Sequence, residues 1–185
     1  MLKFRKYYVL LLVGLSACST TSIDSVSGSL STAAYEQMVS DVTGQGFTPP
    51  SEVPTEGEAT HTGIMTGQFE FVTGTETVVG DASMTFDFEN ALVSGSFSNL
   101  QGSESGAISG TLVVQEANLP GPAFFSGVTG DINVAGNNAA VNASVGGTLY
   151  GSGVTGATGA ITGDVIQTGF TGEVTGGYVV SAGGP

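Results

Sequence analysis

Apolar and polar residues alternate with a period of two along most of the chain after residue 58. In the segment 78–89 the even positions are all apolar or glycine, and from Asp81 onward the odd positions are all polar. Such alternation is typical of a strand with one buried face. The same period recurs in seven further segments, whose apolar sets begin at Ala59, Ala91, Ile108, Phe124, Val141, Ile161 and Phe170. Eight strands with short connections predict an all-β fold, a single eight-stranded antiparallel up-and-down β-barrel that leaves no strand edge exposed.

The composition of the two faces predicts which one points into the barrel. The apolar face mixes Gly and Ala with a few large residues, which suits the narrow interior of a small barrel. The polar face carries six acids with no cation to pair them: Asp81, Asp87, Glu89, Asp131, Asp164 and Glu173. Because unpaired buried carboxylates are costly, we predict a soluble barrel with an apolar core rather than a transmembrane barrel with an apolar outer face. The residues expected to be buried are Phe86, Phe97, Leu112, Ile132 and Leu149, and those expected to be exposed are Asp87, Asn142 and Glu173.

The first 17 residues have the features of an export signal. The basic stretch MLKFRK precedes YYVLLLVGL, an apolar run of nine residues that is too short to span a bilayer as a helix. The sequence Leu-Ser-Ala-Cys, which ends at Cys18, resembles the lipobox of bacterial lipoproteins. That resemblance implies removal of residues 1–17 and acylation of Cys18, including a palmitate-type chain. The next residue is Ser19, and not the Asp that would resemble an inner-membrane retention signal of such lipoproteins. The resemblance therefore favours the outer membrane. The alternative is an ordinary secretory peptide with a chance cysteine.

The charge distribution is extremely one-sided. Lys3, Arg5 and Lys6 are the only basic residues among 185, so that removing residues 1–17 takes the formal charge from −13 to −16. Such a chain repels nucleic acid and anionic lipid headgroups. Any protein partner is therefore expected to be basic. Cys18 is the single cysteine, which excludes an intramolecular disulfide.

Residues 18–57 are predicted to form a lipid-anchored flexible tether with one short helix. The stretch TPPSEVPTEGE is polar and rich in proline. Tyr35, Met38 and Val42 lie on one face of a helical pattern, which Ser31 or Thr32 can cap and Gly44 can end. Two alternatives remain at this stage: a transient helical turn in a flexible stalk, or a helix that docks on the barrel mouth.

No sequence motif indicates catalysis or a cofactor. The stretch GSGVTG (151–156) matches G-x-G-x-x-G, but the strand-like ATGAITGD that follows cannot supply the helix needed for a dinucleotide. His61 is the only histidine and has no evident partner for a metal site or a catalytic base, so it is interpreted as a packed or rim residue. We predict a non-enzymatic protein without a cofactor or metal.

The predicted barrel resembles the β-barrel domain of the transferrin-binding protein B family of surface lipoproteins. The motifs that carry the resemblance are PTEGEATHTG (54–63), GDASMTFDFENALVSGSFSNL (80–100) and GGTLYGSGVTGATGAITGD (146–164). The resemblance covers roughly residues 55–182 and implies a barrel domain at 58–182. Leu149 replaces the usual Phe and Ser152 the usual Pro. The chain has no room for the family's handle domain or second lobe, so transferrin binding is not implied.

The expected function is that of an outer-membrane or surface lipoprotein whose barrel is a binding or display module. The alternative is a structural envelope lipoprotein without a specific ligand. The connections NLQGSES (99–105), NLPGPAFF (118–125) and YGSGVTGATG (150–159) are the candidate partner-binding loops. Phe124, Phe125, Gly151 and Ser152 are their candidate contact residues. For the two phenylalanines the alternative is that one plugs the barrel and the other packs under the tether.

Overall fold

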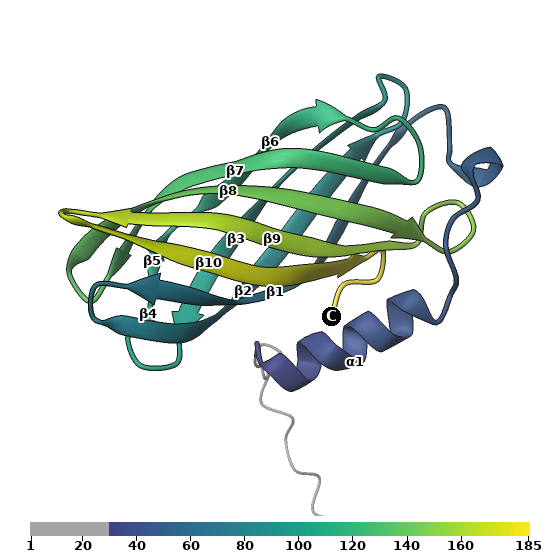
Figure 1. The fold of residues 1–185 in the computed structure, drawn as a ribbon. Coiled ribbons are helices and arrows are strands. Elements are labelled where there is room, and N and C mark those ends of the chain that lie inside the picture. Colours follow the sequence, from purple (N-terminus) through teal and green to yellow (C-terminus); the bar gives the residue numbers. More distant parts are fainter. Residues whose placement is uncertain (1–29) are drawn as a thin grey trace, which may run out of the picture.

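Eight long strands form a closed antiparallel barrel in the computed structural model, which describes residues 30–185 (Figure 1). The long strands are β1 (Glu58–Phe71), β2 (Gly74–Asp87), β3 (Leu92–Gly102), β6 (Leu112–Asn118), β7 (Ala123–Val134), β8 (Asn137–Tyr150), β9 (Gly156–Gln167) and β10 (Phe170–Ser181). Two short strands, β4 (Gly106–Ala107) and β5 (Ser109–Gly110), precede β6. Each long strand pairs with its sequence neighbours, and β1 pairs with β10 to close the ring. The predicted up-and-down barrel is therefore confirmed. The predicted signal at 1–17, Cys18 and residues 18–29 of the tether lie outside the described residues.

The interior of the barrel is filled by the apolar face of the strands. All five side chains expected in the core are at most 2% exposed: Phe86, Phe97, Leu112, Ile132 and Leu149. Asn142 and Glu173 are exposed on the outer face, as predicted. Asp87 also lies on the outer face but is half-buried. Its carboxylate accepts hydrogen bonds from the backbone N–H and the side-chain amide of Asn90, at 3.0 and 2.7 Å. These bonds, that of the side chain above all, lower the pKa of Asp87.

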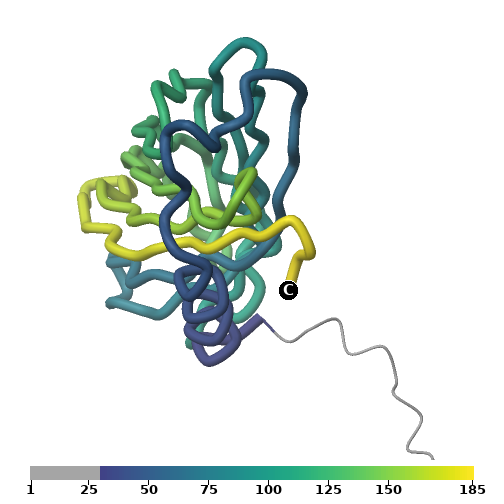
Figure 2. Tube along the Cα trace, turned by 90° about the vertical axis from the view of Figure 1, so that its right-hand side faces the viewer, coloured from purple at the N-terminus to yellow at the C-terminus, as the bar shows by residue number. Residues whose placement is uncertain are grey.

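Helix α1 (Thr32–Thr43) lies along the outer wall of the barrel (Figures 1 and 2). The Ser31 hydroxyl caps its start by accepting a hydrogen bond from the Ala34 N–H at 3.1 Å. Its buried residues Met38 and Val42 belong to one apolar cluster with outward-facing side chains of the barrel, which are Ile64, Val79, Tyr150 and Val179. The expected helix is present, but it matches neither alternative left open by the sequence: it is docked rather than part of a free stalk, and it packs on the outer wall rather than on the barrel mouth. The reason is that three outward positions of β1, β2 and β10 are aliphatic and give the helix an apolar wall to cover.

The chain between helix α1 and β1 is also bound to the barrel. Phe47 bridges to Tyr150, the Thr48 N–H donates to the Leu149 carbonyl at 3.0 Å, and the Gly151 N–H donates to the Gly46 carbonyl at 2.9 Å. A single 3-10 turn, η1 (Pro50–Glu52), follows. The described part of the predicted tether, residues 30–57, is thus attached to the barrel through helix α1 and residues 46–48, although most of its residues are exposed.

The two ends of the barrel differ in their connections. At the first, called here the hairpin end, the turns 72–73, 103–105, 135–136 and 168–169 meet. At the second, called the loop end, the connections 88–91, 119–122 and 151–155 meet, together with residues 46–48. None of the described helices is long and apolar enough to cross a membrane.

One tyrosine in the barrel interior has a buried hydroxyl without a hydrogen-bond partner among the described residues. Tyr178 is fully buried, and its hydroxyl has no partner among the described residues. The hydroxyl occupies space that Gly147 leaves open, since a Cβ at that position would overlap it. Burial, with a smaller contribution from Tyr35, raises the pKa of Tyr178.

We expect Tyr178→Phe to raise the free energy of unfolding at pH 7 by about 1 kcal/mol, because the buried hydroxyl is unsatisfied. The folded-state pKa of Tyr178 lies above that of the unfolded chain. The hydroxyl therefore ionises first in the unfolded chain. This difference has no effect on the free energy of unfolding below about pH 10 and lowers that free energy as the pH rises further. The variant should lose less stability than the wild type between pH 7 and pH 11 in denaturant titrations. A variant that is less stable at pH 7 would contradict this.

Candidate functional site

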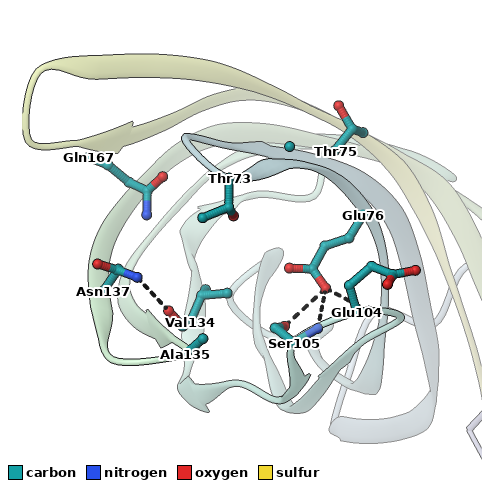
Figure 3. Close-up of a pocket in the computed structure, with 10 residues that line it drawn as sticks. Thr73, Thr75, Glu76, Glu104, Ser105, Val134, Ala135, Asn137 and Gln167 are labelled. Atoms are coloured by element: carbon teal, nitrogen blue, oxygen red, sulfur yellow. Dashed lines mark hydrogen bonds between the residues drawn. The ribbon is translucent and has the colours of Figure 1, made fainter.

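A polar mouth at the hairpin end contains a buried carboxylate (Figure 3). Glu76 is only 6% exposed, because β2 directs it inward opposite Phe69. Its Oε2 accepts hydrogen bonds from the N–H groups of Glu104 and Ser105, at 3.2 and 3.0 Å, and from the Ser105 hydroxyl at 3.0 Å. Glu76 thereby holds the turn 103–105, which belongs to the candidate loop NLQGSES.

The same mouth has a volume of about 240 Å³ and is lined from four different turns or strand ends. Gln167, at the end of β9, is 8% exposed and accepts a hydrogen bond from the Val72 N–H at 2.7 Å. Figure 3 shows the Gln167 amide and the Glu76 carboxylate approaching the opening from opposite sides. Val134 and Ala135, from the end of β7 and its turn, supply an apolar part of the lining.

The loop end carries the other two candidate loops, which the barrel therefore separates from NLQGSES. Phe124 points into the barrel and is 6% exposed, whereas Phe125 stands on the outer wall and is 70% exposed. The prediction that Phe124 is an exposed contact residue is thus wrong. Successive side chains of strand β7 point to opposite faces, so the two neighbours lie on opposite sides of the barrel wall. Phe124 plugs the barrel, as the alternative predicted, but Phe125 does not pack under the tether.

The two candidates in the loop 151–155 also differ. Ser152 is exposed. Gly151 is buried, has a φ of 77°, and leaves room for the side chains of Thr155 and Gln45. Gly151 therefore allows the conformation of the loop and helps to attach residues 46–48, whereas Ser152 is accessible at the surface as a candidate contact residue.

Strands β6 and β7 separate beside Phe125. The pairing of β6 with β7 consists of only Val113↔Thr129 and Val114↔Val128. On its other side, β6 shifts its register against β3 after Val114. The Ser126 hydroxyl of β7 donates a hydrogen bond to the Gln115 carbonyl of β6 at the point where the two strands separate. A notch of about 520 Å³ follows, lined by Ala117, Asn118, Pro120, Ala123, Phe124 and Phe125.

His61 is packed inside the barrel near the loop end and is 2% exposed. Its Nε2 lies 2.8 Å from the Val154 carbonyl oxygen, and its ring meets that of Phe86 edge-on at 5.4 Å. Its Nδ1 has no partner among the described residues. Within residues 30–185, no three His, Cys, Asp or Glu side chains are grouped so that they could hold a metal ion.

Sequence reasoning missed Glu76. The alternation predicts that the even positions 78–88 lie on the buried face, and position 76 continues that register. Extending the strand by two residues would therefore have indicated that Glu76 points inward. Comparison with known proteins adds no assignment: the chain matches no protein-family profile, and no curated protein is significantly similar to it.

Proposed function

We propose that the chain is a non-enzymatic, lipid-anchored lipoprotein of the outer membrane, possessing a barrel that binds a basic protein partner at the cell surface. The signal-like residues 1–17, the lipobox-like sequence ending at Cys18 and the barrel motifs similar to those of transferrin-binding protein B support the anchoring. The observation that carries the binding role is Phe125, a large aromatic side chain that is 70% exposed beside the notch between β6 and β7.

Phe125 has the properties of a binding anchor. It lies on β7, so a rigid scaffold holds it, and the turn containing Pro120 and Pro122 limits motion beside it. A fixed aromatic side chain contributes contact area at a low cost in conformational entropy. Glu116 is exposed on the neighbouring strand, and residues 30–185 contain no Lys or Arg. A partner should therefore present basic residues around an apolar pocket, and its binding should weaken as the salt concentration rises.

A photoreactive phenylalanine analogue tests this role when it replaces Phe125 in cells. We expect one discrete cross-linked adduct, while the same analogue at Ile166, an exposed apolar position far along the barrel, should give none. Phe125→Ala should weaken binding of the captured partner by about tenfold or more, as is usual for an aromatic anchor. Equal adducts at both positions would contradict the proposed site. No adduct at either position would favour a structural lipoprotein without a specific ligand.

A further inference from the structure

We propose that the mouth at the hairpin end is a binding site for a small organic cation, held by Glu76 and Gln167. The first reason is the state of the Glu76 carboxylate. Three hydrogen bonds from the turn 103–105 converge on Oε2, while Oε1 has no partner among the described residues and points into the opening (Figure 3). Gly102 makes this possible, because any Cβ there would overlap Oε2. The acceptor is therefore fixed in place before a ligand arrives, which lowers the cost of binding.

The second reason is charge. Residues 30–185 contain neither Lys nor Arg, so no side chain of the described barrel can neutralise Glu76 except His61, which lies toward the opposite end. Glu104 adds a further negative charge at the rim. An ammonium or guanidinium group in the mouth would form a charge-assisted hydrogen bond to Oε1, the strongest kind available here.

Gln167 adds a requirement for a second polar group in the ligand. The Val72 N–H is a donor, so the amide oxygen of Gln167 must be the atom that faces it, and this contact fixes the orientation of the amide. The Nε2 amino group then projects into the mouth without a partner among the described residues (Figure 3). An N–H donor that is held in the mouth without a protein partner can donate to an acceptor of a bound ligand. The ligand should therefore carry a carbonyl or hydroxyl oxygen in addition to its cation.

The size of the mouth limits the ligand further. Its volume of about 240 Å³ lies below the range of roughly 300–1,000 Å³ that is usual for drug-sized ligands. Val134 and Ala135 offer contact for a short aliphatic segment. The ligand class that fits is an ammonium or guanidinium compound of amino-acid size with one carbonyl or hydroxyl oxygen.

Glycinamide, which has an ammonium and a carbonyl group, is a suitable probe, and propionamide is its neutral counterpart. With the full chain in detergent, glycinamide should shift the amide resonances of Glu104 and Ser105, whereas propionamide should leave them unchanged. Glu76→Gln keeps a hydrogen-bond acceptor for the turn but removes the charge, and it should weaken glycinamide binding by about tenfold or more. Asp131→Asn is the matched control. It removes one exposed charge near the same end of the barrel and should change the affinity by less than about twofold, since exposed charges are screened.

A second variant tests the role of the amide independently of Glu76. Gln167→Glu keeps an acceptor for the Val72 N–H but removes the donor, so it should reduce the preference for glycinamide over methylammonium, which has no carbonyl group. Three results would overturn the proposal: no glycinamide-dependent shift at Glu104 and Ser105, equal weakening by Glu76→Gln and Asp131→Asn, or equal binding of propionamide. The first would leave Glu76 as a support for the turn alone.

Discussion

Replacing Phe86 by alanine should lower the free energy of unfolding by about 3–5 kcal/mol, the usual cost of emptying a packed aromatic site. Phe86 is fully buried, and its ring packs against His61, Phe88 and Phe124, with centroid distances of 5.4, 6.3 and 6.1 Å. The surrounding strands are hydrogen-bonded on both sides, so the wall cannot close over the void. Denaturant titration of the purified chain measures this loss.

Phe125→Ala is the matched control for this prediction, since it removes the same side chain from the outer face of the same barrel. Its effect on stability should stay within about 0.5 kcal/mol, as for most surface substitutions. Similar losses in the two variants would contradict the assignment of the barrel interior as the core. A small loss in both would show that the site at Phe86 is not tightly packed.

Replacing Cys18 by serine should abolish both acylation and retention in the outer membrane. The formal charge is −16 without residues 1–17, which opposes binding of the chain to anionic headgroups. Acyl chains contribute about 0.8 kcal/mol per buried CH₂, so the two or more chains that the lipobox resemblance implies are enough for a stable anchor.

The readout for Cys18→Ser is incorporation of an alkyne-bearing fatty acid, measured together with the amount of the chain in the outer-membrane fraction. Both should fall to background. Ser19→Ala changes the neighbouring residue and leaves the thiol in place, so it should behave as the wild type does. Undiminished labelling of Cys18→Ser would place the lipid elsewhere and contradict the proposed anchor.

The strands could be predicted from the sequence because their signal is local. Alternation over 12 residues places one face of a strand in the core whatever the rest of the chain does. The same argument assigned Phe86 and Leu149 to the interior, where both are fully buried. The position of helix α1 was not predictable in this way. It depends on Ile64 and Val79, which interrupt the polar face of the hairpin β1–β2, and on Val179 of β10, a strand that lies beside β1 only when the barrel closes.

The candidate site shows the same division. Phe124 and Phe125 are adjacent in sequence, and the strand was assigned correctly with Phe124 in its apolar set, so the register already indicated which ring is buried. Interpreting the segment as a loop obscured that. Glu76 and Gln167 are 91 positions apart in the sequence. Only the folded barrel brings the ends of β7 and β9 to the same mouth as the hairpin β1–β2, and no local sequence pattern records this.

The most direct test of the central claim, that a lipid anchor displays this barrel, is the mass of the N-terminal peptide of the mature chain isolated from membranes. We expect a chain that begins at Cys18, whose mass exceeds that of the bare peptide by a diacylglyceryl group and an N-linked acyl chain. A mature chain that begins at another residue, or that carries a free Cys18 thiol, would contradict the anchor and the surface role derived from it.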